Sequence, residues 1–471
     1  MAAGASAPEA ESDPAGTGFG LTRAHGWVLL AAALGWLFDA MDQRLFILAR
    51  TPAIRDLTAG ADPAALPTLA GWATALFIAG WATGGLVFGL VGDRRGRVRT
   101  MALTILMYSV FTGLSGLARS WPEFAAYRFL CGMGIGGEYA AGVALVAETM
   151  PARFRALALG MVQAASSLGA ILGSAASLWI GPQAKIGGWE GWRLLFFLGV
   201  IPSVLLVLIR LRVPEPDRWL KARDEARPGR ELGDVRAIFH DPVLRRRSVI
   251  GMTLGVVGQI GLWSIGLYTP ELVRDVVFAE HRRELAVQAD TLDDLAVAWA
   301  SRTGGDADSR LAHWKAEADR HVGRGTLLQD VGSFFGAPFC TWIAIRFGRR
   351  QAFATAYAMA MASVWLVFGG MTRGADAVWM LPLLGFCTCG IFGVIVVYLP
   401  ELYPTRLRAT GMGFCYNIAR YLTAAAPILL GRLAVASGGY SRAALVMSLV
   451  YVLGLAVVPL APETRGRPLP E

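Results

Sequence analysis

Long apolar runs alternate with short polar segments along almost the whole chain. An α-helix needs about 20 residues to cross the roughly 30 Å of hydrocarbon in a bilayer, so each run predicts one membrane-spanning helix. Glycine and proline occur inside many of the runs, which is usual for membrane helices. The twelve predicted spans cover residues 26–49, 69–91, 98–118, 124–147, 156–181, 191–211, 248–272, 327–347, 352–371, 376–399, 411–435 and 442–461.

The composition of the chain supports this fold class. Of its 471 residues, 55% are hydrophobic and only 17% are charged, whereas a soluble domain carries roughly a quarter charged residues. The pattern therefore predicts an all-α polytopic membrane protein. Residues 1–24 are rich in Ala, Gly, Pro and Ser and lack the basic segment that opens a signal peptide. We expect them to form a disordered cytoplasmic tail.

One glycine-rich stretch has the spacing of a dinucleotide-binding loop, Gly132-x-Gly134-x-x-Gly137. Such a loop needs a preceding strand and a helix that opens at the glycines, but these glycines lie in the middle of a long apolar run. We interpret Gly132, Gly136 and Gly137 as small residues that let a second helix approach closely. No metal is expected either, because the five Cys residues lie inside predicted spans without an accompanying His cluster.

Arginine is unevenly distributed between the two sides of the predicted membrane. The loops after the second, fourth, eighth and tenth spans and the central loop 212–247 are rich in Arg, and the opposite loops are not. Cytoplasmic loops carry the excess of basic residues, so both termini are predicted to be cytoplasmic. This asymmetry accounts for the net charge of +9 without a nucleic-acid partner. The chain is rich in Arg and Ala and poor in Lys, which is typical of proteins encoded by GC-rich bacterial genomes. This usage favours a bacterial inner (plasma) membrane.

Three short motifs recur at an offset of about 250 residues, at the inner ends of corresponding spans. The pairs are GDRRGR (92–97) with RFGRR (346–350), ETMPARFRA (148–156) with ELYPTRLRA (401–409), and PEPDR (214–218) with PETRG (462–466). The repeat predicts two parallel six-helix bundles, as in transporters that rock around a midplane site. The bundles would cover residues 25–211 and 248–461, with a cytoplasmic tail at 462–471.

The repeated motifs place basic and acidic residues at the inner helix ends of both halves. An exposed ion pair contributes only about 0–1 kcal/mol, but a network that closes the inner side can bias two states. Positive-inside topology together with helix capping is the alternative. Topology alone does not explain the repeated Glu148 and Glu401, because acidic residues contribute little to it. The predicted inner gate comprises Asp93, Arg94, Arg97, Glu148, Arg155, Arg349, Glu401 and Arg408.

Six ordered motifs resemble the signatures of the major facilitator superfamily, most of all its sugar-porter-like and metabolite or organic-acid:proton symporter branches. They are GDRRGR, RFLCGMGIGGE, AETMPARFRA, PEPDRWL, PELYPTRLRATG and PETRG. The resemblance extends over nearly the whole chain. It implies a secondary transporter, not an enzyme, with two six-helix bundles, alternating access and a central site.

Charged residues inside the predicted spans indicate that site. A charge at membrane depth costs roughly 2.5–3.5 kcal/mol or more, so it usually faces a cavity and a partner. Three of these residues are acidic and three are basic, which suits one paired network. They are Asp39, Asp42, Arg44, Arg128, Glu138 and Arg420.

A carboxyl group would have to carry any coupled proton, because all five His residues lie in predicted tails or loops. The resemblance matches Asp42 and Arg128 to the first-helix Asp and fourth-helix Arg that pair in proton-coupled family members. A carboxylate–guanidinium pair that forms and breaks with conformation can load and release a proton. A static pair that locks two helices is the alternative, and Asp39 competes with Asp42 as the proton carrier.

Arg420 is the predicted anchor for a substrate anion, because a planar guanidinium binds a carboxylate through two hydrogen bonds. Asn417 lies one turn earlier on the same helix face, and the charged Glu138 and Arg44 complete this part of the set. The alternative role for Arg420 is a structural bond to Glu138 or to a helix-end carbonyl. We therefore expect a small organic acid as substrate.

Two further positions bear on the substrate. By resemblance, Gln163 matches a Gln that sugar porters use for a sugar hydroxyl, but Trp263 stands where their seventh helix carries an Asn. A hexose is therefore disfavoured, and Trp263 either stacks on a ring or faces lipid. A sugar or polyol transporter, a uniporter or exporter on the same fold, and a non-transporting sensor stay open as alternatives.

Residues 273–326 depart from the resemblance. They form an outside connection of about 50 residues, where the family usually has a short one. Their charged sequence has apolar residues at helical spacing, which predicts helices. A helical cap over the entrance and a dispensable surface decoration are both compatible with this pattern. We expect the protein to act as a monomer.

Overall fold

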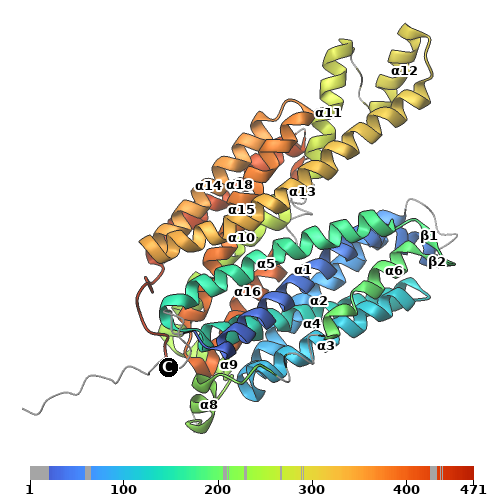
Figure 1. The fold of residues 1–471 in the computed structure, drawn as a ribbon. Coiled ribbons are helices and arrows are strands. Elements are labelled where there is room, and N and C mark those ends of the chain that lie inside the picture. The colour runs from blue at the N-terminus through green and yellow to red at the C-terminus, as the bar shows by residue number, and fades with distance from the viewer. Residues whose placement is uncertain are drawn as a thin grey trace, which may run out of the picture.

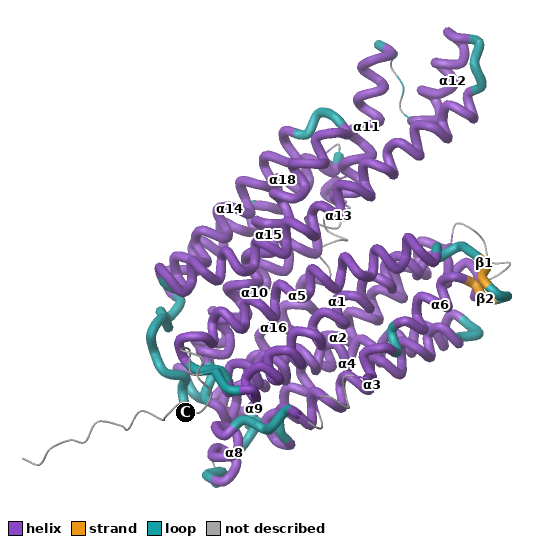
Figure 2. The backbone as a smooth tube through the Cα atoms, viewed as in Figure 1, coloured by secondary structure: helices purple, strands orange, loops and turns teal. Residues whose placement is uncertain are grey.

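The computed structural model describes residues 21–58, 65–204, 209, 212–227, 231–265, 268–287, 289, 291–424, 432–434, 436–437 and 439–471. Helices form most of these residues, and they run side by side in two groups (Figures 1 and 2). The sheet in the described part of the chain is a two-stranded antiparallel hairpin of β1 (Lys185–Ile186) and β2 (Trp189–Glu190).

The first group of helices lies in the N-terminal half. It contains α1 (Arg23–Leu57), α2 (Leu66–Arg95), α3 (Arg97–Leu117), α4 (Trp121–Thr149), α5 (Ala152–Ile180), α6 (Gly191–Leu198) and a 3-10 turn at Ile201–Val204. α1 begins two residues inside the predicted disordered tail, because the side chain of Thr22 caps it by accepting a hydrogen bond from the backbone of His25. Residues 1–20 lie outside the described part.

The second group lies in the C-terminal half. It contains α10 (Pro242–Ile260), a π turn (Gly261–Ile265), α11 (Thr269–Leu285), α12 (Leu292–Thr303), α13 (Ala307–Phe347), α14 (Arg349–Gly370), a 3-10 turn (Gly374–Asp376), α15 (Ala377–Leu402), a 3-10 turn (Thr405–Leu407), α16 (Arg408–Ala424), α18 (Tyr440–Ser448), α19 (Val450–Val457) and a 3-10 turn (Val458–Leu460). The predicted central loop is partly helical. It holds α8 (Asp217–Asp224), α9 (Val235–His240) and the start of α10, which Asp241 caps.

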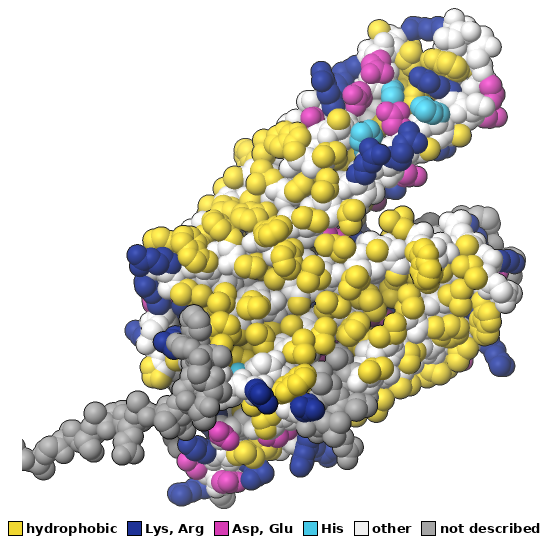
Figure 3. All heavy atoms as spheres, in the orientation of Figure 1, with side chains coloured by type: hydrophobic (Ala, Val, Ile, Leu, Met, Phe, Trp, Pro, Cys, Tyr) yellow, Lys and Arg dark blue, Asp and Glu magenta, His cyan; other side chains and the backbone are white. Residues whose placement is uncertain are grey.

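Eight helices among the described residues are long and apolar enough to cross a membrane. They correspond to the first five, the ninth, the tenth and the twelfth predicted spans. The other four predicted spans fall on α6, α10, α13 and α16. Apolar side chains cover the flanks of both groups in Figure 3, as expected for surfaces that face lipid.

Glycines bring helices into close contact inside each group. A Cβ atom at Gly132 would lie 2.2 Å from the carbonyl oxygen of Phe77, and one at Gly136 would lie 1.9 Å from that of Trp81. α4 therefore packs directly on the backbone of α2, which confirms the predicted role of these glycines. The second group repeats the arrangement, since Gly332 and Gly336 of α13 lie against the backbone of α15.

The two groups meet at one end of the molecule and diverge at the other. α2 packs on α16 and α5 packs on α13, so contacts cross between the groups along both sides. In Figure 1 the two groups lie close together at the end of the molecule where α8 and α9 are found. At the opposite end, a notch in Figure 3 separates the first group from the projecting helices of the second. The two groups are thus joined at the Arg-rich end and separated at the opposite end.

The predicted insertion is largely helical in its described residues. α13 has 41 residues, a length of about 60 Å at 1.5 Å per residue, or about twice the hydrocarbon thickness. Its outer part packs against α11 and α12 around a small separate core that includes Leu295 and Trp314. His281 stacks on Trp314, with 4.9 Å between the ring centroids. The insertion is therefore an ordered projection of the second group.

Candidate functional site

The predicted inner gate contains the same bidentate ion pair in each half. Arg97 donates two hydrogen bonds to Glu148, at 3.0 and 2.9 Å. Arg349 donates two to Glu401, at 3.0 and 2.6 Å. These pairs lie within one helical group each, so they do not themselves hold the two halves together.

A distant glutamate caps the helix that begins at each of these arginines. Glu215 accepts hydrogen bonds from the backbone N–H groups of Arg97, Val98 and Arg99 at the start of α3. At the start of α14, Glu463 accepts them from Arg349 and Arg350. The repeated PEPDR and PETRG motifs thus satisfy helix-end donors that would otherwise lack partners.

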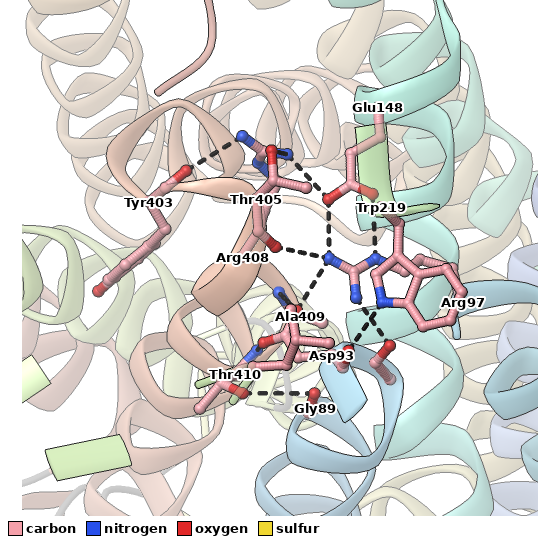
Figure 4. Close-up of polar contacts among 12 residues, drawn as sticks. Gly89, Asp93, Arg97, Glu148, Trp219, Tyr403, Thr405, Arg408, Ala409 and Thr410 are labelled. Atoms are coloured by element: carbon pink, nitrogen blue, oxygen red, sulfur yellow. Dashed lines mark hydrogen bonds and ion pairs between the residues drawn. The ribbon is translucent and has the colours of Figure 1, made fainter. Parts of the chain in front are cut away.

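Three contacts of the gate do cross between the halves (Figure 4). Arg408 of α16 donates to Glu148 at 2.8 Å, and Arg97 donates to the carbonyl of Thr405 at 2.7 Å. Asp93 at the end of α2 accepts hydrogen bonds from the backbone N–H groups of Ala409 and Thr410, at 3.2 and 2.8 Å. The side chains that make these contacts are all buried, so the contacts exclude water and close the inner side. They belong to Asp93, Arg97, Glu148 and Arg408.

The gate is asymmetric, which the repeat did not reveal. The position that corresponds to Asp93 in the second half is Ile345, which cannot cap a helix. Arg155 corresponds to Arg408, but its Nε has no hydrogen-bond partner among the described residues and no ion pair of it is described. Arg94 is exposed and donates weakly to the carbonyl of Leu232 at 3.4 Å. Arg94 has no ion pair among the described residues, whereas Arg155 lies within electrostatic reach of Glu401 in the other half. Their assignment to the inner gate stays a prediction.

Asp42 and Arg128 form a buried ion pair, with 3.3 Å between the carboxylate and the guanidinium. Thr112 donates a hydrogen bond to the other oxygen of Asp42 at 2.6 Å, and Ser115 accepts one from Arg128 at 2.9 Å. The guanidinium also lies 4.7 Å from the ring centroid of Phe196. The pair thus joins α1, α3, α4 and α6 within the first group, where water is excluded and the charges depend on each other.

Asp39 and Glu138 lie close by, on α1 and α4. Both are buried, and their carboxyl groups interact with each other. The charged groups that act on Asp39 are Glu138, Asp42 and, from the second group, Arg420. The Glu138 carboxyl fills the space over Gly35, where a Cβ would lie 2.4 Å from it. Three carboxyl groups therefore gather at the middle of the first group.

Arg420 of α16 faces these carboxyl groups within an aromatic surround. Its guanidinium carbon lies 3.4 Å from the ring centroid of Trp81 and 4.8 Å from that of Tyr416. Tyr416 stacks on Tyr139 with 4.1 Å between centroids. Rings from both groups therefore line the buried guanidinium, and cation–π attraction favours its charge.

The other residues predicted to bind substrate are Asn417, Gln163 and Trp263. Asn417 is buried against Gly85 and donates to the carbonyl of Gly413 at 2.9 Å, which leaves its side-chain oxygen without a partner among the described residues. Gln163 is buried on α5 and lies 3.4 Å from the hydroxyl of Ser166. The side chain of Trp263 lies outside the described residues. Sequence reasoning missed Gln259, which is fully buried and donates to the carbonyl of Tyr416 at 2.8 Å.

Arg44 pairs with a residue that sequence reasoning also missed. Its guanidinium lies 2.5 Å from the carboxylate of Asp330 on α13, in the opposite group, and both side chains are partly exposed. Asp330 lies inside the predicted eighth span, so a complete count of charged residues in the spans would have found it. The contact joins the two groups on the side of the site away from the gate.

The surface hollows that are described lie elsewhere. One of about 510 Å³ is apolar and opens between α2 and α4, and one of about 530 Å³ lies beside Arg95 and Arg99. We place the candidate site at the buried polar group and not at these hollows, because the charges of both halves converge there.

Residues 23–278 match the family model described as Major Facilitator Superfamily, which is more than half of the chain. The chain belongs to the major facilitator superfamily. It is thus a polytopic transporter of the twelve-helix fold and not an enzyme.

Curated relatives of this superfamily member are bacterial transporters. A probable 4-methylmuconolactone transporter of Cupriavidus pinatubonensis is 28% identical over 92% of this chain and 89% of the relative. The niacin transporter NiaP of Acinetobacter baylyi is 26% identical over 94% and 95%. Among solved structures, the proton:xylose symporter XylE from E. coli matches 95% of this chain and 98% of its own, with a TM-score of 0.71 and 20% identity. That structure shares the fold.

Proposed function

We propose that this transporter carries a small organic acid together with protons across the bacterial inner membrane by alternating access, as a monomer with both termini in the cytoplasm. The observation that carries the proposal is that Arg420 from one group lies within electrostatic reach of Asp39 from the other, and that Asp39 in turn lies within reach of Asp42 and Glu138. Buried charges of opposite sign from two movable halves can respond to both an anion and a proton.

Arg420 and its aromatic neighbours support a carboxylate with a flat carbon skeleton as substrate. The guanidinium can bind the carboxylate through two hydrogen bonds, while Trp81 and Tyr416 offer ring faces beside it. Niacin and 4-methylmuconolactone, named for two relatives, are both small ring compounds that carry a carboxyl group. A neutral sugar carries no negative charge that could balance a buried guanidinium, and this disfavours the sugar alternative.

The ion pair of Asp42 with Arg128 supports proton coupling. A protonated Asp42 no longer attracts Arg128, so gain and loss of a proton would loosen and tighten the packing of α1 against α4. Asp39 lies within electrostatic reach and provides a second carboxyl group. We assign the coupled proton to Asp42, because its pairing can be broken and remade, and we give Asp39 and Glu138 the role of setting the negative charge around it.

In the proposed alternating-access cycle, the contacts of the inner gate close the cytoplasmic side of the site. Glu148 with Arg408 and Asp93 with α16 join the halves at that end, so the separation of these contacts would open the site to the cytoplasm. The opposite change, at the notch seen in Figure 3, would close the outer side. The binding energy of substrate and proton would then be needed only to shift between these two states.

Uptake into proteoliposomes tests the proposal. Purified protein is reconstituted, and accumulation of labelled niacin, 4-methylmuconolactone and xylose is measured with and without an imposed inside-alkaline pH gradient. We expect gradient-driven accumulation of at least one of the two acids and none of xylose. Equal uptake with and without the gradient would indicate a uniporter, and uptake of xylose alone would contradict the organic-acid assignment.

Asp42→Asn provides the matched coupling test. It removes the titratable group but keeps the size of the side chain, so we expect gradient-driven accumulation to disappear while exchange of internal for external substrate persists. Asp56→Asn, at an exposed position near the outer end of α1, is the control and should leave both unchanged. Full gradient-driven accumulation by Asp42→Asn would exclude Asp42 as the proton carrier.

A further inference from the structure

A groove at the Arg-rich end of the first group contains positive charge that neither the gate nor the central site uses. It has a volume of about 530 Å³ and lies between α2, α3 and α8. Four arginines line it, Arg94, Arg95, Arg99 and Arg223, together with Trp219. Arg97, the gate residue, is buried behind this surface and is not part of the groove.

Local acids neutralise only part of this charge. Arg223 pairs with Asp224 at 2.8 Å, and the oxygens of Glu215 are taken by backbone donors of α3. Within the described part of the chain, Arg95 and Arg99 have no ion pair, and both are exposed. The groove therefore presents two or more guanidinium groups to an outside partner, and guanidinium groups bind phosphate oxygens well.

The groove is built rigidly enough to be a site. Trp219 is buried and donates a hydrogen bond from its indole N–H to the carbonyl of Asp93 at 2.7 Å. This bond fixes α8 against the end of α2. Arg223 also lies over the ring of Trp219, with 5.5 Å between the guanidinium carbon and the ring centroid. The three helices that carry the arginines are thus held around one hollow before any ligand arrives.

The exposed face of α3 next to the groove indicates the chemical class of the ligand. Along α3, the exposed side chains change from charged at Arg99 to apolar at Leu103, Leu106 and Val110. These positions are three or four residues apart, so they follow one face of the helix. A ligand that reaches from the arginines onto this face must carry an anionic head and a long apolar tail.

We infer that this groove binds the headgroup of an anionic glycerophospholipid from the adjoining leaflet, with its phosphate on Arg99, Arg95 and Arg223 and one acyl chain along α3. The switch from exposed charge to exposed apolar residues marks the depth at which headgroups meet hydrocarbon. Basic clusters beside membrane helices are attracted to anionic lipid. The inference does not depend on which substrate the central site takes.

Binding of short-chain lipids to the purified full chain tests the inference. Dioctanoyl phosphatidylglycerol and dioctanoyl phosphatidylcholine are titrated in detergent, and binding is followed by microscale thermophoresis. Glycerol 3-phosphate and inorganic phosphate serve as free phosphate probes. We expect phosphatidylglycerol to bind at least roughly tenfold more tightly than phosphatidylcholine, because only the former carries net charge. Equal binding of the two lipids would overturn the inference.

A double substitution separates the groove from the general basic character of this face. R99Q/R223Q removes two charges from the groove, and we expect its affinity for phosphatidylglycerol to fall roughly tenfold or more. R245Q/R246Q removes two charges from exposed positions of α10 on the same face and should change the affinity less than twofold. An equal loss in both variants would show unspecific attraction and refute the site.

Two further results bear on the same inference. All the substituted arginines are exposed, so both variants should keep the melting temperature of the parent; R95Q, measured alone, gives a second reading if one of them does not. If glycerol 3-phosphate or inorganic phosphate binds as tightly as phosphatidylglycerol, the groove is a site for a free phosphate and the lipid assignment is wrong. Tighter binding of the lipid supports the acyl path along α3.

Discussion

The carboxylate of Glu148 in α4 and the guanidinium of Arg408 in α16 lie 2.8 Å apart across the boundary between the two helical groups. Glu148 also receives two hydrogen bonds from Arg97 in its own half. One carboxylate therefore joins a local ion pair to the opposite group. All three side chains are buried, so water cannot replace a lost partner, and breaking such a contact costs a few kcal/mol.

Arg408→Gln should open the inner side. Removing the guanidinium breaks the link to Glu148 and shifts the two-state equilibrium toward the inward-open form, by more than tenfold for a few kcal/mol. Spin labels on R94C and R346C, at exposed positions of the two halves, report this as a longer distance. The five native cysteines are buried, which favours selective labelling.

The neighbouring Arg406 provides the control for that measurement. It has no described ion pair, and its Nη1 has no hydrogen-bond partner among the described residues. Arg406→Gln should leave the distance distribution unchanged. A distribution for Arg408→Gln that is the same as that of the parent would show that the contact with Glu148 does not hold the inner side closed.

Arg420→Lys should impair uptake while leaving the fold intact. Lysine keeps the charge but loses the flat guanidinium that packs over Trp81 and binds a carboxylate through two hydrogen bonds. We expect the KM for an organic acid to rise about tenfold or more, since one charge-assisted hydrogen bond contributes about 1.5–3 kcal/mol. Initial rates of uptake in proteoliposomes measure this. Arg442→Lys, at an exposed position of α18, should behave like the parent; an unchanged KM in Arg420→Lys would exclude Arg420 from substrate binding.

Shortening the outer projection should leave transport nearly unchanged. α12 packs on α13 around its own small core, away from the first group (Figure 1). We therefore expect replacement of residues 287–306 by a short Gly-Ser linker to change the uptake rate less than twofold. A variant that loses most of its uptake but keeps its melting temperature would instead support a cap that acts on the entrance.

Glu463→Gln should destabilise the protein in a pH-dependent manner. Burial raises the pKa of the Glu463 carboxyl. Hydrogen bonds from the backbone of Arg349, Arg350 and Arg465 lower the pKa and together outweigh burial, so the pKa lies below the usual 4.5. A carboxyl with a lowered pKa stabilises the folded state above its unfolded pKa, and this contribution is lost as the pH falls through the folded value.

Thermal unfolding of Glu463→Gln checks this at two pH values. At pH 7 the variant should lose about 1 kcal/mol, the usual contribution of a helix cap. As the pH falls through the lowered pKa, the parent carboxyl also becomes neutral, and the difference between the two proteins should shrink. Glu471→Gln at the chain end is the control. A difference that persists unchanged at low pH would mean that the charge of Glu463 is not what stabilises α14.

The sequence alone determined the membrane-spanning helices and their internal repeat, because the length of an apolar run and the order of the motifs can be read directly along the chain. The pairing of Asp42 with Arg128 was expected only from the family resemblance, since the two residues lie on different helices. Glycine spacing likewise predicted the close contact of α4 with α2, because only the absence of a side chain permits it.

Only the tertiary structure decided which charges meet across the halves. Arg97 with Glu148 and Arg349 with Glu401 look alike in the repeat. In the described part of the chain, however, Glu148 forms an ion pair with Arg408 of the opposite group, whereas Glu401 pairs with Arg349 of its own group. Asp93 caps α16 while its counterpart Ile345 caps nothing. Arg44 finds Asp330, and Arg420 is buried between Trp81 and Tyr416. Such partners are far apart in the chain, and their distances depend on how two whole helical groups pack, which no local pattern encodes.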